Sequence, residues 1–270
     1  MGLGLSCAAE ILRLGSTVVL YARSETALER ARATLTADAP GRVHAIAGDV
    51  TDAAGLERLF DAAEAVGGSL SVVHAAAVLS AIGPVIDVEA DAWWETVRVN
   101  LLGTFLVLQA ACRRLVRRGL PGSIVLFSGG GATAAFPNYT AYACGKVGVV
   151  RLAETLAQEM APHGVRVNCV APGFVATRMH AATLEAGAAA GSEYLHRTER
   201  ELRAGGVPPE VAARAVAFLL SDAAEGITGR LLAAVHDDWA RWPEHRSELE
   251  GSDLFTLRRI VPRDRGLAWQ

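Results

Sequence analysis

The stretches Ser123-Ile-Val-Leu-Phe127 and Val165-Arg-Val-Asn-Cys-Val170, with a helical pattern between them, decide the fold of this 270-residue chain. Each short apolar run has the length of a buried strand, and residues 141–163 have the pattern of a long helix. A strand, a helix and a second strand in succession are typical of a parallel sheet with helices on both faces.

The same alternation continues on both sides of this unit. We predict further strands at residues 16–22, 42–47, 70–74 and 229–235, and helices at residues 5–14, 25–36, 91–118 (with a break near Asn100) and 208–221. We find no internal repeat or linker, and 270 residues suit one domain. The sequence therefore predicts a single three-layer α/β/α domain with a doubly wound parallel sheet.

Composition and charge narrow the class of protein. Hydrophobic residues make up 51% of the chain, but they come in short runs broken by charges, and we find no stretch long and apolar enough to span a bilayer. The net charge of −3, with both signs interspersed, gives no reason to expect nucleic acid. The four cysteines have no metal-ligand or disulfide spacing. No basic, apolar leader precedes the fold, so we expect a cytoplasmic protein without a metal site or membrane contact.

The segment Tyr142-Ala-Cys-Gly-Lys146 carries the candidate chemistry. A tyrosine and a lysine four residues apart share one helical face, so the ammonium can favour the ionised phenol and lower its pKa from about 10. A phenol adjusted in this way is a suitable proton donor or acceptor at a carbonyl or alcohol oxygen.

The order of polar and glycine residues along the chain resembles the short-chain dehydrogenase/reductase family, from Gly2 to about Leu232. The resemblance implies a Rossmann-like fold and hydride transfer between a nicotinamide cofactor and an alcohol, ketone or aldehyde. The residues that carry it are Asn100, Ser128, Tyr142, Lys146, Pro172-Gly173 and Thr177.

The resemblance assigns catalytic roles residue by residue. Tyr142 corresponds to the general acid or base, and Lys146 to the residue that holds the nicotinamide ribose and adjusts the tyrosine. Asn100 corresponds to the residue that holds a water in a proton relay, although an asparagine inside a helix can instead satisfy a backbone group at a kink. The alternative class is a non-catalytic or degenerate dinucleotide-binding or interaction protein.

The catalytic serine departs from the family pattern. In the family it usually lies thirteen positions before the tyrosine, and that position here is Gly129, one residue after Ser128. A one-residue shift on a strand turns a side chain to the opposite face. Three glycines after Ser128 can let the backbone rearrange, and Thr133 or a water is the alternative source of the hydrogen bond.

The cofactor residues follow from the same resemblance. Gly2 and Gly4 match the last two glycines of the family's turn before the first helix. At the end of the 16–22 strand, an acid would bind the ribose of NAD, but this chain has Ala22 and then Arg23. A guanidinium suits a 2′-phosphate, so we favour NADP(H), with NAD(H) as the alternative.

Three other segments complete the predicted cofactor site. Asp49-Val50 resembles the family's adenine-contacting pair, although an aspartate after a strand can also cap a helix. His74-Ala-Ala-Ala77 stands where the family has Asn-Asn-Ala-Gly, and small residues such as Ala75 still allow the cofactor to lie against the backbone. Pro172-Gly173 and Thr177 resemble the segment that cradles the nicotinamide.

The family's first strand and first glycine have no counterpart, because Met1 falls inside the motif. That strand is normally central, and its loss leaves two strands apart with unpaired backbone groups. We expect either that the native chain starts upstream, or that this is a degenerate or rearranged protein.

The remaining expectations concern the lid, the tail and the assembly. Residues 1–235 form the predicted cofactor-binding domain, and residues 177–206 have the length of a lid or binding loop. Residues 236–270, with spaced aromatics and mixed charge, are a C-terminal extension expected to pack on the domain or on a partner subunit. The family usually pairs through helices that correspond to 101–118 and 141–163, so a homodimer or homotetramer is expected.

Overall fold

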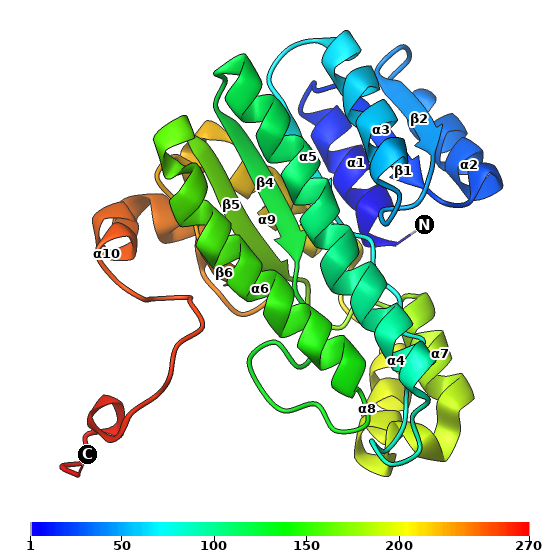
Figure 1. Cartoon of the computed structure of the whole chain (residues 1–270), viewed down its shortest axis with the longest axis vertical. Coiled ribbons are helices and arrows are strands. Elements are labelled where there is room, and N and C mark those ends of the chain that lie inside the picture. The colour runs from blue at the N-terminus through cyan, green and yellow to red at the C-terminus, as the bar shows by residue number, and fades with distance from the viewer. Residues whose placement is uncertain (1, 270) are drawn as a thin grey trace.

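Six parallel strands, with helices before, between and after them, form the fold of the computed structural model, which describes residues 2–269 (Figure 1). The strands are β1 (Val18–Ala22), β2 (Val43–Ala47), β3 (Ser71–His74), β4 (Gly122–Phe127), β5 (Val165–Ala171) and β6 (Leu231–Ala233). The α-helices are α1 (Leu3–Arg13), α2 (Glu25–Thr36), α3 (Ala53–Val66), α4 (Ala90–Val97), α5 (Gly103–Arg118), α6 (Thr140–Met160), α7 (Arg178–Ala186), α8 (Ser192–Arg203), α9 (Pro209–Leu220) and α10 (Arg246–Glu250).

The strands pair in two separate parallel sheets. β1 pairs only with β2, in the register Val18 with Val43, and β3, β4, β5 and β6 pair in that order. β4 and β5 pair over six residues, from Gly122 with Val165 to Phe127 with Val170. No strand among residues 2–269 lies between β1 and β3, so each of these strands has one edge without a strand partner.

Helices cover both faces of the larger sheet and give the three layers. Alternate residues of β4 point to opposite faces, as the pleat requires. Ile124 and Leu126 pack in a core with α3, α5 and α6, whereas Val125 and Phe127 pack in a second core with α1 and α9. β4 contributes fully buried aliphatic side chains to both cores, which makes it the centre of a single α/β domain.

Helix α1 holds the two sheets together. Its residue Cys7 packs in the core with α9, while Ala8 and Leu12 pack against Leu35 and Val43 beside the smaller sheet. All of these side chains are buried. A helix with apolar side chains on two faces can therefore join parts of the sheet that do not share backbone hydrogen bonds.

The helical run from α4 to α5 is broken at the predicted place. A single π-helical turn, η1 (Arg98–Leu102), connects the two helices and contains Asn100. The Asn100 amide explains the distortion, because it accepts a hydrogen bond from Val78 N at 2.8 Å and donates one to Val78 O at 2.9 Å. Such π-turns inside α-helices often lie at functional sites.

The run Ala90–Arg118 also corrects one expectation from the sequence. Its 29 residues are long and apolar enough, by length and composition alone, to cross a membrane, although no such stretch was predicted. More than half of its apolar window is buried inside the protein. The buried apolar residues of α5, such as Val107, Leu108 and Leu115, belong to the core between α3, α6 and the sheet.

Residues 177–206, the predicted lid, are largely helical. They contain α7, a 3₁₀ turn at Gly187–Ala190 and α8. The hydroxyl of Tyr139 donates to Thr183 Oγ1 at 3.1 Å, so α7 is attached to the segment that precedes α6.

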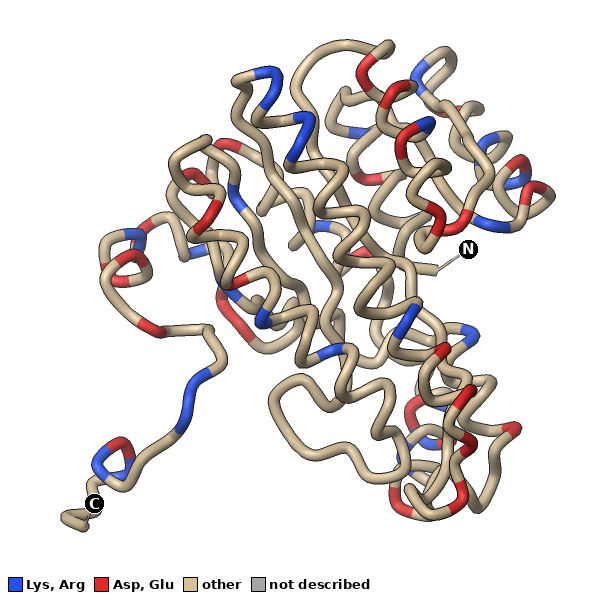
Figure 2. The backbone as a smooth tube through the Cα atoms, viewed as in Figure 1, with Lys and Arg blue, Asp and Glu red and all other residues tan. Residues whose placement is uncertain are grey.

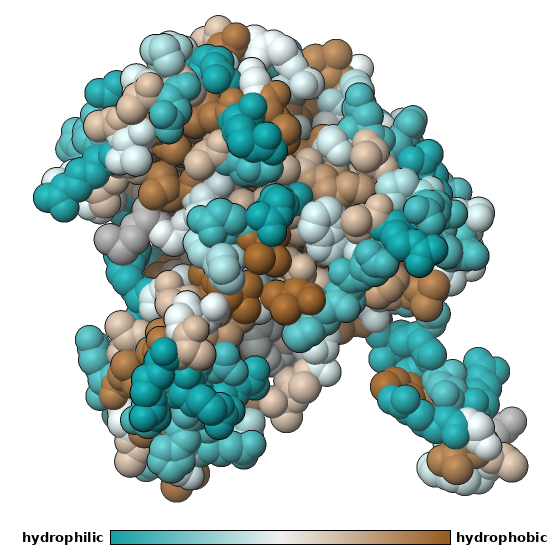
Figure 3. Space-filling view, turned by 180° about the vertical axis from the view of Figure 1, so that it is seen from behind, coloured by the Kyte–Doolittle hydropathy of each residue, from teal (hydrophilic) through white to brown (hydrophobic). Residues whose placement is uncertain are grey.

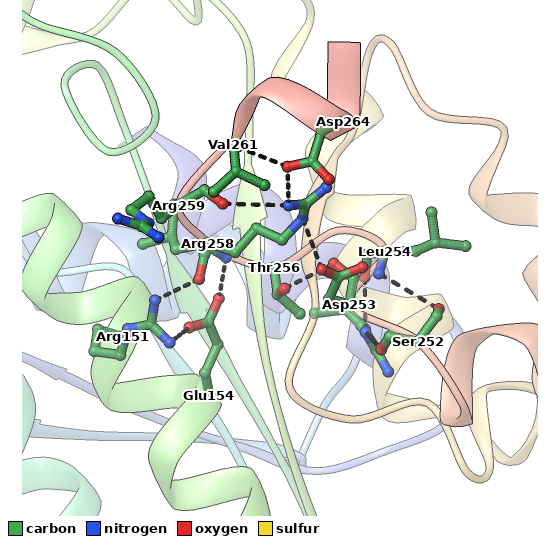
Figure 4. Close-up of polar contacts among 12 residues, drawn as sticks. Arg151, Glu154, Ser252, Asp253, Leu254, Thr256, Arg258, Arg259, Val261 and Asp264 are labelled. Atoms are coloured by element: carbon green, nitrogen blue, oxygen red, sulfur yellow. Dashed lines mark hydrogen bonds and ion pairs between the residues drawn. The ribbon is translucent and has the colours of Figure 1, made fainter. Parts of the chain in front are cut away.

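The first part of the tail, residues 236–257, packs on the domain. Trp242 and Leu249 are buried in the core with α9. The Arg230 guanidinium donates to the carbonyl of Leu249, and it donates to Ser252 O at 3.0 Å and Leu254 O at 2.7 Å. On α6, the Glu154 carboxylate accepts a hydrogen bond from the Leu257 N–H at 2.6 Å (Figure 4).

The tail beyond Leu257 bonds mainly to other residues of the tail. The Arg258 guanidinium lies 2.6 Å from the carboxylates of both Asp253 and Asp264. In the space-filling view this segment is a largely hydrophilic lobe set apart from the body (Figure 3). Arginines predominate in this segment, with Asp264 as the acid among Arg258, Arg259, Arg263 and Arg265, whereas both signs are interspersed over the rest of the molecule (Figure 2).

Hydrogen exchange should reveal the division of the sheet. Val72 and Val73 of β3 and the first four residues of β1 are partly exposed, whereas Ile124, Val125 and Leu126 of β4 are fully buried. We expect amides on the unpaired edges of β1 and β3 to exchange faster than those of β4 by about 100-fold or more. Exchange measured residue by residue by NMR checks this, and equal protection of β3 and β4 would contradict it.

Candidate active site

Tyr142 and Lys146 lie together on the buried side of α6, at the carboxyl end of β4. Lys146 Nζ donates a hydrogen bond to Phe127 O, the last carbonyl of β4, at 2.8 Å. The same ammonium lies 5.6 Å from the centre of the Tyr142 ring. Both side chains are less than a tenth exposed. The four-residue spacing therefore brings the two groups to one place, as the sequence predicts.

The pKa of Tyr142 moves in the direction opposite to the prediction. Burial raises the pKa of the phenol above its ordinary value, with a smaller contribution from Tyr194. Burial also lowers the pKa of Lys146 to about 8, below its ordinary value. The prediction considered the lysine charge but not the cost of removing the phenol from water.

Ser128 and Gly129, the two positions considered for the catalytic serine, directly follow β4. A Cβ added at Gly129 would lie 2.4 Å from Tyr142 Oη, so the tyrosine hydroxyl occupies the space that a side chain at this position would need. Ser128 is buried, and its Oγ has no hydrogen-bond partner among residues 2–269. Thr133 is exposed. A buried hydroxyl without a partner is costly, which makes Ser128 the better of the two serine/threonine candidates.

Asn100 lies across from α6 and is fixed in place. Gly145 leaves room for it, because an added Cβ there would lie 3.1 Å from Asn100 Cβ. Both ends of the Asn100 amide bond to Val78, and its main-chain carbonyl accepts from Thr104 Oγ1 at 2.7 Å. The side chain thus satisfies backbone groups, as in the alternative that the sequence left open, but those groups belong to Val78 after β3 rather than to the π-turn itself. A role in proton relay stays a prediction.

His74 ends β3 and is buried near Lys146. Burial is the main cause that lowers the pKa of its imidazole to about 4, and the Lys146 charge adds to the effect. Its Nε2 has no hydrogen-bond partner among the described residues. His74 is therefore neutral at pH 7.

An aromatic cluster, which the sequence analysis missed, surrounds Tyr142. It consists of Phe136, Tyr139 and Tyr142 before and on α6, and Tyr194 on α8. The ring of Phe136 stacks on Tyr139 with centroids 4.3 Å apart, and its edge-to-face contacts with Tyr194 and Tyr142 have centroid distances of 4.7 and 6.5 Å. Phe136 and Tyr139, close together between β4 and α6, are the signal in the sequence that could have indicated this cluster.

Met179 of α7 closes this cluster over the tyrosine. Its Sδ lies 4.0 Å from Tyr142 Oη, in contact with the phenol oxygen that would meet a substrate. Leu79 and Ile82 pack against the same cluster. Met179 of the predicted lid thus covers the candidate catalytic residue.

Two surface hollows, of about 380 and 480 Å³, lie away from Tyr142, one between α6 and the tail and one beside the smaller sheet.

The predicted cofactor glycines lie at the start of α1 and beside β3. Gly2 has φ +76°, which favours glycine, and an added Cβ there would meet nothing within 4 Å. Gly4 packs against Ala75, with 3.7 Å between an added Cβ and Ala75 Cβ. The start of α1 therefore presents an open, glycine-lined backbone at the carboxyl end of β3.

Arg23, Asp49 and Val50 lie where β1 and β2 end. Asp49 Oδ1 accepts hydrogen bonds from the N–H and the hydroxyl of Thr51, both at 2.8 Å, and Asp49 Oδ2 lies 4.0 Å from Arg23 Nε. Asp49 therefore closes a turn, and Asp52 caps α3 instead, with its carboxylate accepting from Ala54 N at 3.0 Å. Val50 packs against Gly103 of α5.

Pro172, Gly173 and Thr177 form the passage from β5 to the lid. Gly173 has φ +79°, and an added Cβ would lie 2.7 Å from Val235 Cγ2, so only glycine fits. Thr177 precedes α7, and its N–H donates to His180 Nδ1 at 3.3 Å. These residues thus connect the sheet edge to the helix that carries Met179.

Comparison with known proteins identifies the family. A family model described as Enoyl-(Acyl carrier protein) reductase matches residues 1–234. Dehydrogenase/reductase SDR family member 4 of Sus scrofa is 33% identical over 229 residues, which cover 84% of this chain and 80% of that protein. This chain belongs to the short-chain dehydrogenase/reductase family.

Other members of the family agree with this assignment. 3beta-hydroxysteroid dehydrogenase 1 of Eggerthella lenta is 35% identical over 235 residues, which cover 86% of this chain and 87% of that protein. A crystal structure of an actinorhodin polyketide ketoreductase variant with NADPH has a TM-score of 0.77 at 28% identity, covering 86% and 91% of the two chains. NAD⁺-bound xylitol dehydrogenase has a TM-score of 0.76 at 25% identity, covering 86% and 92%.

The residues of this short-chain dehydrogenase/reductase fit a nicotinamide dinucleotide. Parallel strands place their carboxyl ends at one edge, where α/β proteins bind such ligands. At this edge lie the open backbone of Gly2, the tight turn at Gly173 and the Ser128 hydroxyl, which has no hydrogen-bond partner in the described part of the chain. The N-terminus of α1 offers unpaired N–H groups to a pyrophosphate.

Acid should destabilise the protein through His74. Because folding lowers the pKa of His74 from 6.5 to about 4, its contribution to stability is present above pH 6.5 and is lost as the pH falls toward 4. Between pH 7 and 4.5, His74→Asn should lose about 2 kcal/mol less unfolding free energy than the parent chain. Urea unfolding across this range measures the difference.

The exposed residue His163 supplies a matched control. His163→Asn removes the same side chain outside the core and should keep the parent's dependence on pH. If His74→Asn also keeps that dependence, the imidazole is not held neutral by burial.

Proposed function

We propose that this chain is an NADP(H)-dependent oxidoreductase that interconverts an alcohol and a ketone or aldehyde, with Tyr142 as general acid and base. The buried pair of Tyr142 and Lys146 at the carboxyl end of β4 is the observation that carries the proposal. Gly129 and Met179 adjoin the phenol oxygen, so a substrate that displaces Met179 would meet the hydroxyl directly.

The residues of the chain bind and orient the substrate and exchange a proton with its oxygen, and the nicotinamide would supply the hydride. Tyr142 gives its proton to the carbonyl oxygen during reduction and takes a proton from the alcohol during oxidation. Ser128 donates the second hydrogen bond to the substrate oxygen, which would satisfy its buried Oγ. Lys146 holds the nicotinamide ribose and favours the ionised phenol. A water held at Asn100 would supply the relay of protons from solvent.

The cofactor contacts follow the sheet edge. Gly2, Gly4 and Ala75 form the backbone surface for the pyrophosphate, and Asp49 and Val50 hold the adenine. Pro172, Gly173 and Thr177 hold the nicotinamide. This arrangement is supported by the glycine-only conformations of Gly2 and Gly173.

The preference for NADP(H) rests on Arg23. Its side chain is 63% exposed at the end of β1, free to reach a ligand, and Ala22 occupies the place of a ribose-binding acid. Asp49, 4.0 Å from Arg23 Nε, keeps the guanidinium at this edge. A 2′-phosphate offers the planar group two or more acceptor oxygens.

The assembly we propose is a homodimer or homotetramer in the cytoplasm, without contact to nucleic acid or membrane. Exposed apolar side chains follow one another along η1, α5 and α6, the helices through which the family pairs. They are Leu102, Phe105, Val116 and Val147. All four cysteines are free thiols, which suits a reducing compartment.

Replacing the phenol tests the reaction. Tyr142→Phe keeps the ring in its aromatic cluster but removes the proton that the reaction transfers. We expect turnover with NADPH and a carbonyl substrate to fall by about 10²- to 10⁴-fold. The dissociation constant of NADPH, followed by nicotinamide fluorescence, should stay within a few-fold. Unchanged turnover would remove Tyr142 from the reaction.

Reversing a charge tests the cofactor preference. Arg23→Asp removes a guanidinium–phosphate contact and places a like charge beside Asp49 and the phosphate. NADPH binding should weaken about 10- to 100-fold, while NADH binding changes much less. Arg30→Asp makes the same charge change in the exposed part of α2 and is the matched control. Equal weakening of both cofactors by Arg23→Asp would contradict the assignment.

A further inference from the structure

We infer that the substrate is an uncharged, apolar carbonyl compound or secondary alcohol that carries a ring, held between the aromatic cluster and Met179. This inference rests on the proposed function, since it names the substrate class of the Tyr142 site.

The rings around Tyr142 determine the shape that fits. Phe136 presents its edge or face to three other aromatic rings, and Tyr139 and Tyr194 lie 5.1 Å apart at 73°. Aromatic rings favour such offset and perpendicular contacts with other rings at centroid distances of about 4.5–7 Å. A flat ring next to the reacting carbon can take part in the same packing.

The side chains packed in the cluster carry no charge for an ionic substrate. Apart from the aromatic residues, they are aliphatic or thioether groups: Leu79, Ile82, Met179, Ala186 and Ala190. Arg197, whose charge acts on the Tyr194 phenol, is exposed on α8, and the Lys146 ammonium donates to Phe127 O. His180 stacks on Phe174 with centroids 3.9 Å apart, and burial lowers its pKa, which disfavours a cationic form. A carboxylate here would be buried without a partner.

Hydroxyl-rich substrates would find few hydrogen-bond partners at this site. The Tyr139 hydroxyl already donates to Thr183 Oγ1. Thr198 Oγ1 has no partner among residues 2–269, but Thr183 and Thr198 are almost completely buried, so the Tyr194 hydroxyl is the more accessible polar group of the cluster. Ser128 and Tyr142 are committed to the reacting oxygen. Most further hydroxyls of a polyol would therefore lose their hydrogen bonds to water without replacement.

Met179 marks the position that the substrate takes. Its thioether is 4.0 Å from Tyr142 Oη and is a weak acceptor on a flexible, apolar side chain. The phenol therefore has a poor hydrogen bond in the closed lid, and a carbonyl oxygen would provide a better one. Displacement of Met179 leaves the substrate against the same apolar neighbours.

A matched pair of ketones tests the inference on the full chain with NADPH. 4′-Methylacetophenone and 4-acetylbenzoate share shape and reacting group but differ in charge, and D-xylulose supplies the hydroxyl-rich comparison. We expect kcat/KM for the neutral ketone to exceed that of each of the other two by about 100-fold. A preference for the carboxylate or the ketose would overturn the inference.

Equilibrium binding keeps the test independent of turnover. Titration calorimetry of the NADPH-saturated protein would compare 1-(4-methylphenyl)ethanol with 4-(1-hydroxyethyl)benzoate, and at least about 10-fold tighter binding of the neutral alcohol is expected. Equal binding, or no binding of either, would overturn the substrate class. Failure of the proposed function has a different signature, in which the neutral alcohol binds but neither the parent chain nor Tyr142→Phe turns over the ketone.

Two variants test whether the substrate binds at the aromatic cluster. Phe136→Leu keeps an apolar side chain but removes the stacking ring, so the neutral ketone should lose about 10-fold in kcat/KM through KM. Trp94→Leu removes an exposed ring on α4 and should leave kcat/KM unchanged. Equal effects of the two variants would contradict binding at the aromatic cluster.

Discussion

The buried contact between α6 and the β4–β5 pair is the constraint on which the site depends. It joins the helix to the strand through the bond from Lys146 to Phe127 O, in a core of fully buried aliphatic side chains. Gly145 and Gly148 let η1 approach the helix closely, against Asn100 and Leu101. Because α6 cannot rotate or slide without breaking these contacts, the position of Tyr142 relative to the end of β4 is fixed before any ligand binds.

The sequence predicted the strands well because each one is a short apolar run between charged segments. The helix α3 was missed although Asp52 caps its start and Leu56 and Phe60 have helical spacing. The π-turn was expected only as a break, since its form depends on the bond between Asn100 and the distant backbone of Val78. The sequence could not explain why Gly129 stands where the family usually has its serine. The reason is spatial, because the Tyr142 hydroxyl occupies the space that a side chain at position 129 would need.

The aromatic cluster and the raised pKa of Tyr142 have a common origin that no local pattern contains. Phe136 and Tyr194 are 58 positions apart, and they meet only because the lid folds back over α6. The same closure removes the phenol from water, which outweighs the nearby ammonium. Spacing on one helix predicts which groups meet. It does not predict how much solvent the rest of the fold excludes.

Phenol ionisation is therefore linked to the packing of α7 and α8 over Tyr142. Burial is the largest cause of the raised pKa of Tyr142, so a conformation in which these helices expose the hydroxyl to water would lower that pKa. By the same linkage, ionisation of the phenol would favour such a conformation. Hydration would also raise the pKa of Lys146 from about 8 toward its ordinary value. The electrostatic effect that the spacing of Tyr142 and Lys146 predicts is thus opposed by burial of both groups in this structure.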